Sequence, residues 1–140
     1  MEFEVKRQIY WGECDPAGIV YTPKFLDMSF QAMEHFWQEH VQIGWLDLQA
    51  EQQITTPMVH VEMDFMAPAR SGDHISIWFA IEKLGRSTIH YRARGMMGQR
   101  PLFVVRIISS MVDQKIFKSV EIPTAIRAKL APFVLSPSSE

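Results

Sequence analysis

Hydrophobic and polar residues alternate at the start of the chain and then lose this period. Phe3, Val5 and Ile9 fall on one face of an extended segment, with polar residues between them, and this alternation predicts a strand. Residues 11–22 follow neither a strand period nor a helical one and contain proline and glycine, so they predict a loop.

A long apolar helix is predicted after this loop, because the hydrophobic residues from Pro23 onward recur at helical spacing. One row along this helix consists of Leu26, Phe30, Met33, Trp37 and Val41. A second row widens the apolar stripe and consists of Phe25, Met28, Ala32 and Phe36. We expect the helix to end near Gly44 and a shorter helix to follow it in residues 45–53.

Strand patterns dominate the second half of the chain. Four long strands are predicted in the segments MVHVEMDFMA, HISIWFAIEKL, STIHYRARGM and PLFVVRIISSMV. Short turn segments separate them, so neighbouring strands are expected to be mostly antiparallel. The segment IPTAIRAKLAPF predicts a C-terminal helix, and we expect residues 136–140 to form a loose tail.

These elements predict one α+β domain over residues 1–135. The unusually apolar helix has to be covered, and a curved antiparallel sheet wrapped around it does so with the strands available. This arrangement is the hotdog fold, although other α+β folds contain the same elements. A single sheet around one helix leaves unpaired strand edges, which invite association between copies of the chain.

The composition is that of a globular protein. The 140-residue chain is 47% hydrophobic and 21% charged, which allows a sizeable core. No apolar run approaches the ~20 residues of a membrane helix, and the N-terminal segment lacks the pattern of a secretion signal. The single cysteine excludes an intramolecular disulfide. We therefore expect a cytoplasmic protein.

Charge is distributed unevenly along the chain. Residues 1–82 contain four Lys/Arg against thirteen Asp/Glu, whereas residues 83–139 contain ten against two. Either folding brings these opposite charges together, or part of the second half faces an anionic ligand. A nucleic-acid partner is not expected, because the net charge is −2 and no RNA-type aromatic motif is present.

The loop before the helix, GECDPAGIVYTPKF, carries the most specific chemistry. Asp15 precedes a proline and should be extended, while Gly18 allows the chain to turn back. Thr22 is a good N-cap for a helix whose first residue is Pro23. The free N–H groups of that first turn favour a negative oxygen, so a carboxylate beside them would suit acyl transfer. Alternatively, Asp15 only caps a turn.

The stretch DPAGIVYTPKF resembles the signature of the 4-hydroxybenzoyl-CoA thioesterase family of hotdog proteins, and the order of strands and helix agrees over nearly the whole chain. The resemblance implies hydrolysis of an acyl-CoA thioester without a metal or redox cofactor. It implies that Asp15 is the catalytic carboxylate and that the backbone N–H near Thr22 polarises the thioester carbonyl. It also implies a homo-oligomer, a dimer or a tetramer, whose sites lie between subunits.

The resemblance also indicates substrate-binding positions. We expect Gly18, Tyr21 and Phe30 to contribute to substrate binding. In the branch specific for hydroxybenzoyl groups an acid is expected where this chain has Phe30, so an unsubstituted aryl or an aliphatic acyl group is favoured here. Hydrolysis of acyl carrier protein thioesters and non-catalytic binding of an acyl-pantetheine remain alternative functions. Asp15 would act as nucleophile or as general base.

The segment KLGRS lies where members of this family hold the phosphates of CoA, so Lys83, Arg86 and Ser87 are candidate phosphate contacts. They belong to a wider basic set: Lys83, Arg86, Arg92, Arg94 and Arg100. The alternative is a solvated edge strand whose charges oppose aggregation.

Other candidate functional residues have weaker support from the sequence. His35 and Glu39 share a helical face, but a metal site prefers two histidines four apart and a third ligand. Cys14 has no histidine placed by a motif to activate it. His60, Glu62 and Asp64 alternate on one strand face, which would face solvent or a subunit interface, or else reach a partner's active site.

Overall fold

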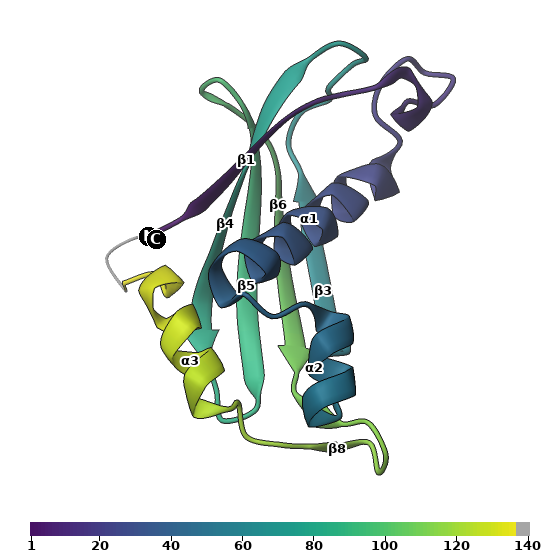
Figure 1. Ribbon diagram of the computed structural model, residues 1–140. Helices are drawn as coiled ribbons and strands as arrows, with labels where there is room; N and C mark the ends of the chain where they lie inside the picture. The colour runs from purple at the N-terminus through teal and green to yellow at the C-terminus, as the bar shows by residue number, and fades with distance from the viewer. Residues whose placement is uncertain (137–140) are drawn as a thin grey trace.

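The computed structural model describes residues 1–136, and a five-stranded antiparallel sheet dominates it (Figure 1). The strands occur in the order β1-β4-β5-β6-β3. Their bounds are Phe3–Gln8 for β1, Met58–Phe65 for β3, His74–Leu84 for β4, Thr88–Met97 for β5 and Arg100–Ser110 for β6. The predicted first strand and the four predicted long strands are all present, and β1 and β3 form the two edges of the sheet.

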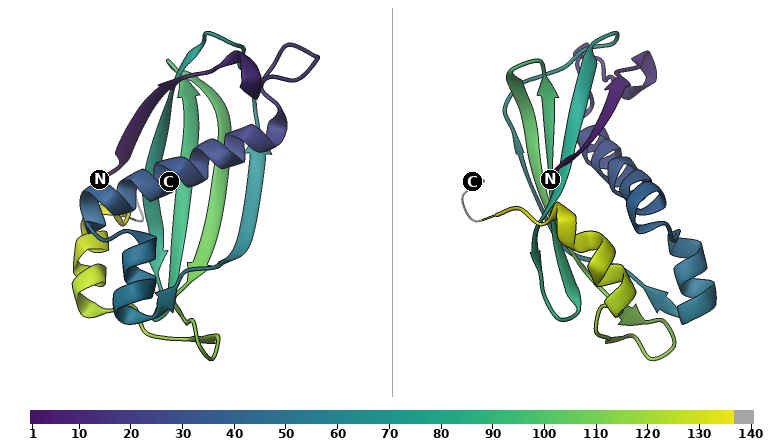
Figure 2. Two further views of the ribbon diagram at one scale, coloured as in Figure 1. Left: turned by 45° about the vertical axis from the view of Figure 1, so that its right-hand side comes forward. Right: turned by 60° about the vertical axis from the view of Figure 1, so that its left-hand side comes forward.

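The central helix α1, Thr22–Phe36, crosses one face of the sheet diagonally, and the sheet curves around it (Figure 2). Five of its buried residues belong to the predicted apolar stripe: Phe25, Met28, Ala32, Met33 and Phe36. Ser29 is buried with them, whereas Leu26 and Phe30 of the predicted stripe are half-buried. A π-helical turn, η2, continues the helix from Trp37 to Val41. The chain therefore has the predicted α+β hotdog fold. No helix in residues 1–136 is long and apolar enough to cross a membrane.

Most of the shorter elements lie at one end of the sheet, where α2, β8 and α3 are found (Figure 1). The helix α2, Trp45–Gln52, follows α1 as predicted and leads into a small sheet in the order β2-β7-β8, formed by Ile54–Thr55, Val112–Asp113 and Lys118–Ser119. The predicted C-terminal helix is α3, Thr124–Leu130. Short 3-10 turns occupy Trp11–Glu13 and Ala131–Phe133. The predicted loose tail lies outside the described residues, apart from Ser136.

The core forms where the second half of α1 meets the middle of the sheet. Phe36 is fully buried, and its ring lies 5.1 Å from that of Phe79 and 4.8 Å from that of Phe133. Trp37 donates its indole N–H to the hydroxyl of Tyr91 across 3.0 Å, so both buried polar groups are satisfied. Burial raises the pKa of the Tyr91 phenol, which therefore stays protonated.

One local expectation is wrong, and one alternative considered for the basic segment does not hold. Tyr21, not Thr22, is the N-cap of α1, and Thr22 and Pro23 are its first two helical residues. The backbone of Tyr21 is already fixed by a hydrogen bond from its N–H to the Glu13 carbonyl, so the helix begins one residue early. The basic strand β5 is also not an edge strand, because it is the central strand of the sheet.

Candidate active site

Asp15 lies in a tight loop, which is closed by hydrogen bonds of the backbone and the side chain of Asp15. Its Oδ1 accepts a hydrogen bond from the N–H of Ala17 across 2.8 Å, and its carbonyl accepts one from Gly18 across 2.9 Å. Its N–H donates to the carbonyl of Ile19 across 3.0 Å. Gly18 has φ 82°, a conformation that glycine adopts at little cost. The carboxylate is half-buried and keeps Oδ2 without a hydrogen bond to any described residue.

Glu13 anchors this loop to the rest of the fold. Its carboxylate receives two hydrogen bonds from the Arg7 guanidinium on β1, and its carbonyl accepts the N–H of Tyr21 across 2.9 Å. The N–H of Val20 donates to the carbonyl of Ala69 across 2.9 Å. No motif in the sequence points to Glu13, although its place two residues before Asp15 was a signal. These contacts fix Asp15 relative to the start of α1.

The start of α1 presents free backbone donors. Thr22 occupies the first helical position, so its N–H has no acceptor within the helix. Pro23 has no N–H, and the N–H of Lys24 donates to the Tyr21 carbonyl across 2.7 Å. This leaves the Thr22 N–H as the exposed donor at the positive end of the helix dipole. Tyr21 is 53% exposed and lies beside it.

An apolar pocket of about 330 Å³ opens beside this helix start. Its wall includes Ile19, Val20, Thr22, Phe25, Phe65 and Met66. The ring of Phe25 lies 4.7 Å from that of Phe103. Phe103 packs directly over Gly95, because a Cβ at position 95 would lie only 2.1 Å from Phe103 Cε1. The Asp15 loop borders the pocket through Ile19 and Val20, and Thr22 with its free N–H lines the same pocket, so the loop, the helix start and an apolar cavity adjoin one another.

Phe30 does not lie beside Asp15 and the helix start. It sits eight residues after Thr22, about 12 Å along the axis of α1. Its side chain is half-buried and packs against the core. Its role in substrate binding stays a prediction.

The candidate phosphate contacts lie at the opposite end of the sheet from Asp15 within one chain. The Asp15 loop is tied to the start of β4, because the Ile9 N–H donates to the Asp73 carbonyl. Lys83 is the second-last residue of β4, and Arg86 and Ser87 follow its end, so all three lie about 33 Å from its start, the length of its eleven residues. One chain therefore does not bring these two groups together.

The turn that carries Arg86 is held by its backbone. Arg127 Nη2 donates to the Gly85 carbonyl across 2.7 Å, and the Ile122 N–H donates to the Arg86 carbonyl across 2.9 Å. The side chains of Lys83 and Arg86 are exposed, and neither forms an ion pair with another residue in 1–136. Both cations are thus available to a ligand.

The charge asymmetry is partly resolved inside the fold. Glu2 lies 3.3 Å from Arg92 and 3.0 Å from Arg94, and Glu82 lies 3.1 Å from Arg106. Acids from the first half of the chain thus pair with bases from the second half. The first of the two interpretations holds for these three arginines.

The remaining candidates do not assemble into a metal site. His35 Nε2 lies 2.7 Å from Glu39 Oε1, and His60 Nε2 lies 3.5 Å from Glu62 Oε1. No group of three or more metal-ligating side chains occurs within the described part of the chain. Cys14 is half-buried, with its Sγ 3.8 Å from the Tyr10 carbonyl.

Comparison with known proteins identifies the family. A family model described as the thioesterase-like superfamily matches residues 9–130. The chain belongs to this superfamily. The match covers the Asp15 loop, the central helix and every strand of the main sheet except β1, and it confirms the resemblance found in the sequence.

Individual members of the superfamily are similar over different lengths. A 1,4-dihydroxy-2-naphthoyl-CoA hydrolase from Synechocystis sp. is 33% identical over 75 residues, which cover 54% of each chain. The present chain thus spans about half the length of the relatives of this name that it matches at 33–34% identity. A solved thioesterase-superfamily structure from Jannaschia sp. CCS1 is 28% identical, with a TM-score of 0.88 over 96% of this chain and 94% of that one.

A second solved structure is a 4-hydroxybenzoyl-CoA thioesterase in complex with 4-hydroxybenzoyl-CoA. It is 20% identical to this chain, with a TM-score of 0.85, and the match covers 92% of this chain and 98% of the other. At this identity the likeness establishes the fold. The thioesterase superfamily and the hotdog fold are therefore assigned on independent grounds.

Proposed function

We propose that this protein is an acyl-CoA thioesterase, which hydrolyses a small acyl-CoA to the free acid and CoA. The observation that carries the proposal is the position of Asp15. Its half-buried carboxylate lies in the loop that leads into α1, and the first residue of that helix, Thr22, has a free N–H and lines an apolar pocket of about 330 Å³. A carboxylate, an oxyanion donor and a place for an acyl group are the parts that thioester hydrolysis requires.

The reaction would proceed in one of two ways. Asp15 attacks the thioester carbonyl carbon and expels the CoA thiolate, forming a mixed anhydride that water cleaves to the acid. Alternatively, Asp15 takes a proton from a water molecule that attacks the same carbon. In both cases the negative charge develops on the carbonyl oxygen, where the Thr22 N–H and the helix dipole would stabilise it. Neither version of the reaction needs a metal or redox cofactor. The proposal also includes a cytoplasmic location for the protein.

An aryl acyl group is the favoured substrate class. The pocket beside Thr22 is walled by Phe25 and Phe65, whose rings suit a flat apolar group. Relatives of this chain are named for the hydrolysis of 1,4-dihydroxy-2-naphthoyl-CoA, which carries such a group.

The test is an assay of thiol release from benzoyl-CoA, 2-naphthoyl-CoA, 1,4-dihydroxy-2-naphthoyl-CoA and a short aliphatic acyl-CoA. The same acyl groups on acyl carrier protein test the alternative carrier. Turnover of an aryl-CoA supports the proposal. Binding of these esters without hydrolysis would instead identify a non-catalytic acyl-pantetheine-binding protein.

We predict that the protein is at least a homodimer, paired through β3. This edge strand exposes Val59, Val61 and Phe65, which are 60%, 40% and 49% exposed. Unpaired backbone groups and exposed apolar side chains on one strand favour pairing with a second copy. Light scattering should give at least twice the chain mass of 16.2 kDa.

The variant Val61→Lys places a charge in the middle of this edge and should yield a monomer of low activity. Its circular dichroism spectrum should match that of the wild type, which separates loss of pairing from loss of fold. A wild-type protein that is fully active as a monomer would refute the predicted dimer.

Pairing through β3 would also unite groups that one chain keeps apart. Antiparallel pairing of two copies places the end of one β3 beside the start of the other. The Asp15 loop lies near the end of β3, and the turn of Arg86 lies at the end of the sheet where β3 starts (Figure 1). Arg86 would then contact the phosphates of a CoA held by Asp15 of the partner subunit.

We predict that Arg86→Ala raises KM for an acyl-CoA several-fold and leaves kcat nearly unchanged. A contact with the distant phosphates stabilises substrate and transition state equally, so it affects KM alone. Because an exposed phosphate contact is screened by salt, the wild-type KM should rise with salt more than that of the variant.

The control is Arg100→Ala, which removes the same exposed charge from the β5–β6 turn at the other end of the sheet. A short acyl-pantetheine thioester, which lacks the nucleotide, should not distinguish Arg86→Ala from the wild type. If the variant is equally impaired on this ester, Arg86 does not bind phosphate.

A further inference from the structure

The strand β1 carries one charged residue in the row of side chains that faces the core. Phe3, Val5 and Ile9 alternate in this row and belong to the core or pack against it. Arg7 occupies the remaining position of the row and pairs across the sheet with the buried Ile75. Only 18% of its side chain is exposed. Because arginine is seldom buried this far unless it is paired, its partner explains why it stands there.

The partner of Arg7 is Glu13. Arg7 Nη2 donates to both carboxylate oxygens of Glu13, across 2.6 Å to Oε2, and Glu13 Oε1 also accepts the N–H of Tyr10 across 2.9 Å. Only 20% of the Glu13 side chain is exposed. Arg7 Nη1 donates to Gln31 Oε1 on α1 across 3.4 Å. The guanidinium thus connects β1, the turn before Asp15 and the central helix.

Glu13 also forms the base of the loop that carries Asp15. Its carbonyl accepts the N–H of Tyr21 across 2.9 Å, and two residues further along the N–H of Asp15 donates to the carbonyl of Ile19 across 3.0 Å. The chain between Glu13 and Tyr21 therefore forms a narrow antiparallel loop. Asp15 lies on one side of this loop, and Thr22 follows directly after the other side, where α1 begins (Figure 1).

The direction of this loop relative to the sheet decides whether Asp15 can act together with the helix start. Hydrogen bonds within the loop fix its shape but not its direction. Two contacts connect it to other parts of the chain: the ion pair from Glu13 to Arg7, and the bond from the Val20 N–H to the Ala69 carbonyl. A misplacement of ~1 Å between reacting groups can cost ~100-fold in rate, so these contacts bear on catalysis without touching a substrate.

We propose that Arg7 and Glu13 are positioning residues. Their ion pair holds the loop so that the Asp15 carboxylate and the Thr22 N–H face the same thioester carbonyl. Neither residue lines the pocket beside Thr22. Because the pair controls the geometry of the reacting groups, its effect is expected in kcat rather than in KM. This inference rests on the proposed thioesterase function and on Asp15 as its catalytic carboxylate.

The first test is Glu13→Gln, which keeps the length of the side chain and one oxygen for the Tyr10 N–H but removes the charge. Its kcat for the aryl-CoA that the wild type hydrolyses fastest should fall ~10-fold or more. KM should stay within ~2-fold of the wild-type value. Thiol release is measured at a temperature at which circular dichroism shows both proteins folded. A kcat within ~2-fold of the wild type would overturn the proposed role.

Glu2→Gln is the matched control. The side chain of Glu2 is 24% exposed and pairs with Arg92 and Arg94, so the same substitution weakens ion pairs of similar burial elsewhere on the sheet. This variant should keep the kcat of the wild type. A loss in Glu2→Gln as large as that in Glu13→Gln would mean that weakening any such ion pair lowers kcat, and the specific role of Glu13 would be refuted.

A double-mutant cycle tests whether the two residues act as one unit. Arg7→Met alone should lower kcat about as much as Glu13→Gln does. The double variant Arg7→Met/Glu13→Gln should be at most ~2-fold slower than either single variant, because the first substitution already breaks the pair. If the two single losses multiply in the double variant, the residues act independently and the proposed pair is wrong.

A second cycle tests whether the pair acts through Asp15. In the Asp15→Asn background, Glu13→Gln should leave the residual kcat unchanged, since no carboxylate remains to be positioned. A purely structural role of Glu13 would lower this residual rate as much as it lowers the wild-type rate. That result would overturn the assignment of Glu13 as a positioning residue.

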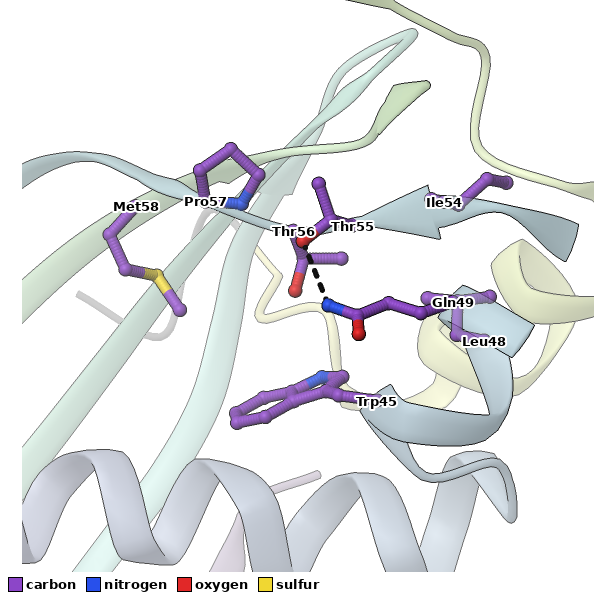
Figure 3. Close-up of a pocket in the computed structure, with 8 residues that line it drawn as sticks. All are labelled: Trp45, Leu48, Gln49, Ile54, Thr55, Thr56, Pro57 and Met58. Atoms are coloured by element: carbon purple, nitrogen blue, oxygen red, sulfur yellow. Dashed lines mark hydrogen bonds between the residues drawn. The ribbon is translucent and has the colours of Figure 1, made fainter. Parts of the chain in front are cut away.

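Hydrogen exchange separates a failure of this inference from a failure of the proposed function, because it measures the loop without any hydrolysis. Amides in residues 13–21 should exchange ~10-fold faster in Glu13→Gln, the change expected when a charged hydrogen bond is lost. Exchange around the pocket of Figure 3 should not change. That pocket includes Met58, the first residue of β3, whereas the loop contacts Ala69, which follows the strand's last residue.

The outcomes of this exchange experiment differ for the two proposals. Unchanged exchange in residues 13–21 would overturn the hold of the ion pair on the loop, whatever the activity of the protein. Faster exchange in a protein whose wild type hydrolyses no acyl-CoA would support this hold and refute the thioesterase function alone. Faster exchange together with an unchanged kcat would refute positioning in an active thioesterase.

Discussion

Replacement of Asp15 by Asn is expected to lower kcat for an acyl-CoA at least ~100-fold, because the amide is neither a nucleophile nor a base at neutral pH. The loop should persist, since an amide oxygen can still accept the hydrogen bond that Oδ1 receives from Ala17. The measurement is steady-state thiol release, with a thermal melt to show that Asp15→Asn remains folded.

The matched control is Asp27→Asn, which removes a carboxylate from the exposed face of the same helix start. Asp27 has a side chain that is 60% exposed and lies 3.9 Å from Lys24, a weak surface pair. This variant should keep the activity of the wild type. If Asp15→Asn retains more than a tenth of the wild-type kcat, Asp15 is not the catalytic carboxylate.

Truncation of Phe36 is expected to have the largest effect on stability. Phe36→Ala should lower the free energy of unfolding by about 3–5 kcal/mol, since it removes a fully buried ring and leaves a cavity. The ring contacts Phe79 on the sheet and Phe133 after α3, so its loss loosens the helix from both. Urea unfolding at a fixed protein concentration measures the change, because the stability of a dimer depends on concentration.

Phe117→Ala is the comparison, because Phe117 is 67% exposed. This surface truncation should change stability by less than about 0.5 kcal/mol. A loss below 1 kcal/mol in Phe36→Ala would contradict the packing described here for the core.

The periodic elements could be predicted from the sequence because each period reflects a buried face. The helical stripe that includes Met28, Met33 and Phe36 is the surface that α1 packs on the sheet. The alternation in β4 places Ile75, Ile77 and Phe79 against that helix. The start of α1 was misplaced by one residue, because the bond from Tyr21 to the Glu13 carbonyl fixes the backbone there and outweighs the capping preference of Thr22.

The candidate catalytic segment was also accessible from sequence, for a different reason. The Asp15 loop and the first turn of α1 are contiguous in the chain, and most of their hydrogen bonds join residues two to eight positions apart, the bond from Val20 to Ala69 excepted. Local turn chemistry, with a proline and a glycine at the required places, therefore determines their geometry. The sequence determined by itself that a carboxylate precedes a helix whose first N–H groups are free.

Only the tertiary structure decided which distant residues meet. The pairing of Glu2 with Arg92 and Arg94 joins residues 90 and 92 positions apart, and no local pattern indicates it. The central place of β5 and the separation of the Asp15 loop from the Arg86 turn by the length of β4, about 33 Å, likewise depend on strand order. Strand order follows from burying one apolar helix under one sheet, a property of the whole chain. Composition and periodicity give each segment its structure but not its neighbours.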